Sequence, residues 1–260
     1  MNSPRRRFAL SHIVLACAAL AMLAPAAPAL AAGDSWFGGG HTAGNGNIKK
    51  QARTVGHFDG VSMSLSGNVE LRTGSTEGLT IETDDNLLPL IETVVENGML
   101  QIRPAKRNMN LDTHTMKIVV TARQVSHLSL GGSGMIDADA LRGAKLQVEL
   151  GGSGAITVKA VDGDSLAVSL GGSGNLKASA GSVKDLSVSI GGSGDVRLAN
   201  VKSMDASVNI AGSGGVVIAV RDHLSVNIAG SGDVDYYGDP KVSKTVIGSG
   251  NARRLGGAAR

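Results

Sequence analysis

The chain has 260 residues, a formal net charge of +3 and an aromatic content of only 2%. So few aromatic side chains disfavour a globular enzyme, because enzyme cores and pockets normally use them. The interior must instead be narrow and filled by Val, Leu, Ile and Ala.

Residues 1–31 have the pattern of a secretory signal peptide. Arg5-Arg6-Arg7 gives the positive start, residues 13–24 form an apolar core, and Ala29-Leu30-Ala31 gives the cleavage signal. The core is too short to span a bilayer of ~30 Å as a helix. We therefore expect no transmembrane segment in the mature chain, which would lie in the periplasm, on the surface or outside a Gram-negative bacterium. Sec export is the default, and Arg5-Arg6-Arg7-Phe8 leaves twin-arginine export open.

Export also changes the charge and the cysteine content. The signal holds three of the 25 basic residues, which leaves 22 basic against 22 acidic residues in the mature chain. A neutral chain gives no electrostatic basis for nucleic-acid binding. Cys17 is the only cysteine and lies in the signal, so we expect no disulfide, no thiolate metal site and no cofactor.

The next two segments differ in regularity. Residues 32–54 are rich in Gly and Asn and predict a flexible leader. Residues 55–122 predict an irregular, β-rich part of the domain, with a break or short helical turn at residues 86–91, which contain Pro89. The expected strands are Val61–Leu65, Val69–Leu71, Leu79–Ile81, Leu100–Ile102 and Ile118–Val120.

Residues 123–258 are dominated by an internal repeat. A Gly-Ser-Gly triplet recurs seven times, at intervals of 20 and then 18 residues. Alternating apolar residues flank each triplet, which predicts strand, corner, strand and then a polar return loop such as residues 162–165. The fold class is therefore all-β, a β-helix-like solenoid of 18–20-residue coils with Gly-Ser-Gly corners. The structural corners are Gly132, Ser133, Gly134, Gly152, Ser153, Gly154, Gly172, Ser173, Gly174, Gly192, Ser193, Gly194, Gly212, Ser213, Gly214, Gly230, Ser231 and Gly232.

Glycine suits these corners because a sharp turn needs positive φ or a close backbone approach. Stacked coils, ~4.8 Å apart, would share one aliphatic core that no single coil could bury. The last coil places Lys244 and Arg254 at positions that are apolar in earlier coils. Polar residues in these columns predict a cap over the open sheet edge.

Several motifs resemble the head GIN domain family, which is described as the head of autotransporter adhesins. They are Phe58-Asp59-Gly60-Val61, residues 84–88 (Asp-Asp-Asn-Leu-Leu), Asn97-Gly98-Met99-Leu100 and the serial Gly-Ser-Gly corners. The resemblance covers roughly residues 55–250, with the motifs in the family's order. It implies an exported β-helix-like fold and an adhesin-like role, but no catalytic residues. Neither a membrane barrel nor a wall anchor follows in the sequence.

Three chemical interpretations of these motifs are disfavoured. A phosphate-binding glycine loop would precede a helix, whereas every Gly-Ser-Gly here precedes a strand pattern. Calcium-binding β-rolls need Asp at a position that holds an apolar residue here. The mature histidines, which have no metal-ligand spacing, are His41, His57, His114, His127 and His223.

A polysaccharide-cleaving β-helix enzyme remains open as an alternative. Such an enzyme needs two carboxyl groups ~5–10 Å apart, one of them with a raised pKa. Adjacent coils could bring scattered carboxylates together. The candidates are Asp137, Asp139, Asp162, Asp164, Asp195 and Asp235.

The outward positions before the later corners predict a neutral polar face. Stacked hydroxyls and amides could bind a saccharide, a surface protein or a second copy of the chain. The preferred function is thus a non-catalytic envelope or surface module, adhesin-like; the alternatives are the polysaccharide enzyme and a self-assembling envelope protein. The candidate face consists of Ser187, Ser189, Ser207, Asn209, Ser225 and Asn227.

Overall fold

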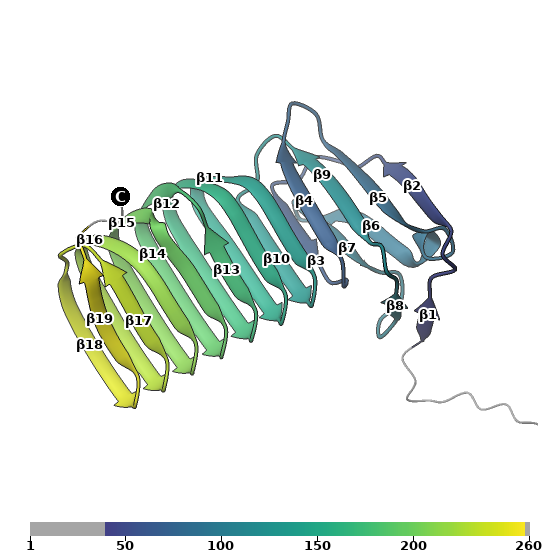
Figure 1. Ribbon diagram of the computed structural model, residues 1–260. Coiled ribbons are helices and arrows are strands. Elements are labelled where there is room, and N and C mark those ends of the chain that lie inside the picture. The colour runs from purple at the N-terminus through teal and green to yellow at the C-terminus, as the bar shows by residue number, and fades with distance from the viewer. Residues whose placement is uncertain (1–39, 258–260) are drawn as a thin grey trace, which may run out of the picture. The chain divides into compact units, whose positions relative to one another are not determined.

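The computed structural model describes residues 40–257, of which nearly all the regular structure is strand. The predicted signal peptide, residues 1–31, and the first part of the leader lie outside the described residues. Strands make up 72% of these described residues, and they form a β-solenoid of about six turns (Figure 1). The all-β solenoid prediction is therefore confirmed.

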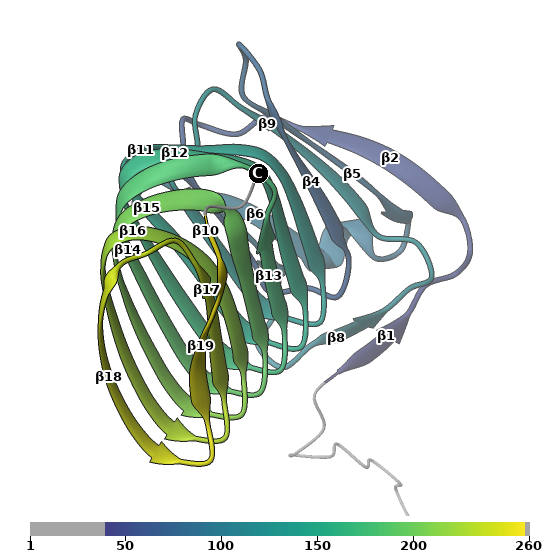
Figure 2. The same cartoon turned by 60° about the vertical axis from the view of Figure 1, so that its left-hand side comes forward.

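The regular coils run from the middle of the chain to its C-terminal end (Figure 2). Their strands pair in parallel with the next coil, as the repeat requires: Leu130 lies beside Leu150, and Gly171 beside Gly191. The strands are β10 (His127–Gly132), β11 (Met135–Gly152), β12 (Ala155–Gly172), β13 (Asn175–Ala178), β14 (Gly181–Gly192), β15 (Asp195–Gly212), β16 (Gly215–Gly230), β17 (Asp233–Tyr237), β18 (Lys241–Gly248) and β19 (Asn251–Gly256).

The inward positions of these strands form one continuous aliphatic core. Val148, Val168 and Val188 are one such column, each at most 2% exposed. Because the repeat stays in register, an aliphatic residue of one coil lies on an aliphatic residue of the next. Burial of this kind contributes about 25 cal/mol per Å² of apolar surface, so the stacked coils stabilise each other without disulfides.

Each corner uses its two glycines in different ways. Gly172 has φ +125°, a left-handed conformation that side chains rarely adopt. A Cβ on Gly174 would lie 2.5 Å from the Gly154 carbonyl oxygen of the preceding coil. The Ser173 amide donates a hydrogen bond of 3.0 Å to the carbonyl oxygen of Gly152, which links adjacent corners.

The predicted return loop differs from the structure, because the polar segment continues the sheet. β12 runs unbroken through residues 162–165, with Asp162 paired to Arg142 on one side and Ser182 on the other. The polar composition favours a loop, but Asp162 and Ser165 pair with both neighbouring coils, so the segment continues the sheet.

The N-terminal part continues the stack and then opens into antiparallel pairs. β3 (Gly60–Met63) and β4 (Asn68–Thr73) pair in parallel with β10 and β11. The remaining elements are β5 (Gly78–Asp84), a 3₁₀ helix η1 (Leu88–Leu90), β6 (Ile91–Glu96), β7 (Met99–Pro104), β8 (Asn110–Asp112) and β9 (Lys117–Ala122). β5 pairs antiparallel with β9, and β6 antiparallel with β7. The 3₁₀ helix lies at the break predicted around Pro89.

The flexible leader expected over residues 32–54 is wrong where the structure describes it. β1 (His41–Ala43) pairs with β8, and the six residues of β2 (Ile48–Arg53) pair antiparallel with β5. The Arg53 guanidinium also donates hydrogen bonds to the carbonyl oxygens of Leu88 and Ile91, at 2.7 and 2.6 Å. The open edge of β5 supplies the partners that a Gly/Asn-rich composition does not reveal.

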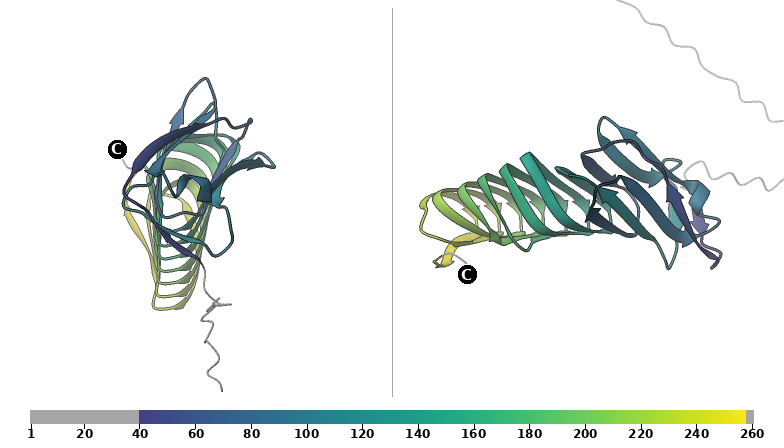
Figure 3. Two further views of the ribbon diagram at one scale, coloured as in Figure 1. Left: turned by 90° about the vertical axis from the view of Figure 1, so that its right-hand side faces the viewer. Right: turned by 90° about the horizontal axis from the view of Figure 1, so that it is seen from above.

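The C-terminal coil has the polar columns that the sequence predicts. Lys244 lies opposite Val226, and Arg254 opposite Tyr236. Figure 3 shows this end of the stack from two further directions. Within residues 40–257, no helix is both long and apolar enough to cross a bilayer.

Candidate binding groove

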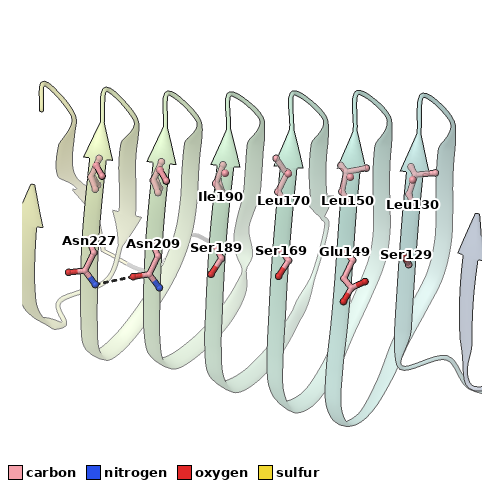
Figure 4. A pocket seen from close by; sticks show the side chains of 18 of the residues that line it. Ser129, Leu130, Glu149, Leu150, Ser169, Leu170, Ser189, Ile190, Asn209 and Asn227 are labelled. Atoms are coloured by element: carbon pink, nitrogen blue, oxygen red, sulfur yellow. Dashed lines mark hydrogen bonds between the residues drawn. The ribbon is translucent and has the colours of Figure 1, made fainter. Parts of the chain in front are cut away.

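The strands that precede the corners carry two neighbouring rows of outward residues along the stack. We call the first the polar row: Ser129, Glu149, Ser169, Ser189, Asn209, Asn227 and Thr245. The second row, which we call the glycine row, lies two residues further along each strand: Gly131, Gly151, Gly171, Gly191, Ala211, Ala229 and Ile247. Figure 4 shows most of the polar row, together with the apolar residues Leu130, Leu150, Leu170 and Ile190 that lie between the rows. Both rows exist because consecutive coils pair in register.

An open groove with a volume of about 830 Å³ runs along these two rows. The polar row forms one side. Between the rows lie the apolar residues of the same strands, whose side chains point into the core, as Leu130 and Ile190 do at 1% and 3% exposure. The groove therefore combines a polar edge with a floor of backbone and glycine Cα atoms.

The backbone does not require the glycines of the glycine row. Gly151, Gly171 and Gly191 have no left-handed φ, and a Cβ on any of them would meet no atom within 4 Å. Ala211, Ala229 and Ile247 occupy the same row in later coils, so side chains are tolerated there. The glycines leave this part of the groove free of side chains, although glycine weakens a strand by about 0.5–1 kcal/mol relative to alanine.

The polar row has free hydrogen-bonding capacity. The Asn227 amide donates to the Asn209 side-chain oxygen at 3.0 Å, and Gln147 donates to Glu149 at 2.7 Å. For the hydroxyls of Ser129, Ser169 and Ser189, residues 40–257 supply no hydrogen-bond partner. These hydroxyls can bind water or a ligand.

The structure divides the predicted polar face into two parts. Ser189, Asn209 and Asn227 line the groove. Ser187, Ser207 and Ser225 form the next row and line a smaller hollow of about 370 Å³, beside Asp205 and His223. Ser129, Glu149, Ser169 and the glycine row were not predicted from the sequence. The 20-residue period places the first three in register with Ser189, and the glycine row lies two residues further along the same strands.

Five of the six candidate carboxylates of a polysaccharide enzyme lie within 4 Å of a cation: Asp139–Lys159 at 2.7 Å, Asp164–Lys184 at 2.7 Å, Asp235–Arg253 at 3.0 Å, Asp195–Arg197 at 3.5 Å and Asp162–Arg142 at 3.9 Å. The sixth, Asp137, lies opposite Glu70 of β4. The Lys159 ammonium lowers the pKa of Asp139, whereas a general acid needs a raised pKa.

Four of the histidines lie within 4 Å of a carboxylate, namely His41, His57, His127 and His223, and two of these contacts are short. His223 Nδ1 lies 2.7 Å from Asp205, and His57 Nδ1 lies 2.6 Å from Glu77. In the part of the chain that the structure describes, no three His, Asp or Glu side chains are placed to hold a metal ion together.

The protein belongs to the family described as "Putative auto-transporter adhesin, head GIN domain". The sequence profile of that family matches residues 57–240, which include the groove-bearing strands β10 to β16. The resemblance inferred from the sequence motifs is thus confirmed. A search of curated proteins gave no match.

Solved structures of proteins from three bacteria have a similar fold. A "putative lipid binding protein" from Parabacteroides distasonis is 26% identical, with a TM-score of 0.68, and the match covers 83% of this chain and 99% of that one. A "putative adhesin" from Bacteroides fragilis is 20% identical, with a TM-score of 0.76, over 82% of this chain and all of that one. A "putative adhesin" from Parabacteroides merdae is 20% identical, with a TM-score of 0.66, over 83% and 99%.

Proposed function

We propose that the protein is a non-catalytic, adhesin-like binding module of the cell envelope or surface, and that the groove is its recognition surface. The observation that carries this proposal is the glycine row. Four successive coils keep glycine where neither the backbone nor the packing needs it. Glycine in a strand is expected where a ligand approaches the backbone closely.

The fold supports a binding role rather than a catalytic one. The groove lies on strands that are paired on both sides over most of its length, so its rows are held at a fixed spacing. A rigid surface loses little conformational entropy when it binds. Five of the six candidate carboxylates lie beside cations, and the pKa of Asp139 is lowered, whereas a general acid needs a raised pKa.

The family and one relative point to the same kind of role. The family is described as an adhesin head, and a relative with 26% identity is described as lipid-binding. Both descriptions concern binding. An adhesin acts outside the cytoplasm, in agreement with the signal-like residues 1–31; fractionation of cells expressing a tagged chain tests that location.

Binding of the purified protein to a panel of immobilised glycans, lipids and matrix proteins tests the role of the groove. The double variant Gly171→Leu/Gly191→Leu fills the groove without touching the core. The matched control Asn175→Leu places the same side chain on exposed β13, away from the groove.

We expect the wild type and Asn175→Leu to bind the same panel members and the groove variant to lose them. Equal binding by all three proteins would show that the groove is not the recognition surface. A reducing-sugar assay that detected polysaccharide cleavage would refute the non-catalytic role.

A further inference from the structure

We propose that the ligand of the groove is a neutral, linear glycan that lies along the solenoid axis, across the strands. This inference rests on the proposed function and names the ligand class for the same groove. Three observations carry it: the charge of the two rows, the unpaired hydroxyls of the polar row, and the shape of the floor.

The charge of the groove favours an uncharged ligand. Among the residues of the polar row and the glycine row, Glu149 is the only charged one. Without a cation in either row, a polyanion such as an acidic polysaccharide or a nucleic acid would gain no ion pair. Glu149 would also repel it.

The hydroxyls of the polar row disfavour an apolar ligand. A hydroxyl that loses water without gaining a partner costs about 1–3 kcal/mol. An acyl chain offers no partner to Ser129, Ser169 or Ser189. An apolar face of another protein would likewise offer these hydroxyls no hydrogen-bond partner. The hydroxyl groups of a glycan can donate to and accept from each serine and asparagine in turn.

The floor of the groove suits the C–H groups of a sugar. Glycine Cα atoms expose carbon at the floor, where the C–H groups of a pyranose ring can pack closely. The seven coils of the polar row extend over about 29 Å at a rise of ~4.8 Å per coil. A straight ligand can therefore make the same weak contact repeatedly.

The floor also limits where the ligand lies. It is open at four glycine coils, rises at Ala211 and Ala229, and ends at Ile247, whose side chain is 73% exposed. We therefore place the ligand over the glycine coils, between Ser129 and Ser189. Ile247 bounds the groove at its C-terminal end.

Titration calorimetry of the full mature chain with cello-, laminari- and malto-oligosaccharides tests this inference. We expect affinity for at least one series to rise from the disaccharide to about the tetrasaccharide and then level off, because the four glycine coils span only about 14 Å at ~4.8 Å per coil. Binding should change little with salt, because no ion pair forms. A charged oligogalacturonate series should not bind.

Two variants connect the binding to the groove. Ser169→Ala/Ser189→Ala removes two hydroxyls and should weaken binding about 10-fold to 100-fold, since each hydrogen bond contributes on the order of 1 kcal/mol. Gly171→Leu should abolish binding, and Asn175→Leu should leave it intact. Unchanged circular dichroism spectra would show that the variants fold.

Some outcomes overturn the glycan but not the groove. One such outcome is that no neutral series binds, but a lipid or matrix protein of the panel, or the neutral detergent dodecyl tetraethylene glycol, does bind. If Gly171→Leu abolishes that binding, the ligand class is wrong and the proposed function stands. Glycan binding that Gly171→Leu leaves unchanged would overturn both the inference and the groove as recognition surface.

Discussion

Two adjacent glycines on β12 should respond in opposite ways to the same substitution. Gly171 has no left-handed φ and open space around its Cα, so Gly171→Ala should stabilise the protein by about 0.5–1 kcal/mol through lower chain entropy in the unfolded state. Gly172 has φ +125°, and a Cβ there would collide with the Gly152 carbonyl oxygen. That oxygen belongs to the ladder of the preceding coil and cannot move away.

The cost of Gly172→Ala follows from two contributions. A left-handed conformation for a residue with a side chain costs on the order of 1–3 kcal/mol, and overpacking against fixed atoms adds about 1–3 kcal/mol. With the stabilisation expected for Gly171→Ala, the two alanine variants should therefore differ by about 5 kcal/mol in the free energy of unfolding. For a chain of this size that corresponds to a difference in Tm of about 15 °C.

Urea unfolding followed by circular dichroism near 218 nm measures this difference. The urea concentration at the midpoint of unfolding is a better measure than an extrapolated free energy, because a stack of coils need not unfold in a single step. Equal destabilisation by both variants would mean that the backbone needs glycine at both positions, and the argument that the glycine row serves a ligand would fail.

Three further predictions concern other parts of the fold. The Thr113 hydroxyl and then the Gly46 amide (2.6 Å) lower the pKa of Asp84, which is 3% exposed; its folded-state pKa lies below the unfolded value, so the stabilisation is present near neutral pH and is lost as pH falls below about 4. Unfolding midpoints measured against pH should show this loss, and Asp84→Asn should flatten the profile. Leu128→Ala, at a fully buried position, should cost about 2–5 kcal/mol in urea unfolding; a cost below 1 kcal/mol would contradict the continuous core. Lys244→Val should extend the apolar column of Val226 to the open end and increase concentration-dependent association in sedimentation velocity; an unchanged monomer would argue against a capping role for Lys244.

The sequence predicts the solenoid well because its strongest signals are local and repeated. Aliphatic residues at alternate positions, such as Leu166, Val168 and Leu170, fix which side chains point inward. The 20-residue spacing then fixes the register, because parallel coils can stack only with matching corners in contact. The repeated signal resolves each coil even though a single strand of this length is ambiguous.

The remaining features depend on contacts that no local pattern encodes. β2 becomes a strand because β5 offers it an open edge, which its own Gly/Asn-rich surroundings do not indicate. Residues 162–165 become strand because both neighbouring coils pair with them. The groove cannot be predicted from the sequence for another reason. Gly171 and Gly172 look alike in the sequence, and only their φ angles and surroundings separate a corner that needs glycine from a position that does not.

The change from 20- to 18-residue coils shows that the groove face is kept constant while other parts of the coil vary. Between β15 and β16 the register shifts at Leu198/Lys202 and at Ser203/Asp205. Both shifts precede the segment of β15 that bears the groove, where Asp205 to Gly212 pairs with His223 to Gly230 without interruption. Asn209 therefore still lies beside Asn227, close enough for their 3.0 Å hydrogen bond. If the stack needed only a filled core, a coil could become two residues shorter at any of its turns. Here the coil becomes shorter only before Asp205, outside the groove-bearing segment. The polar row therefore stays aligned, as expected if a ligand spans successive coils.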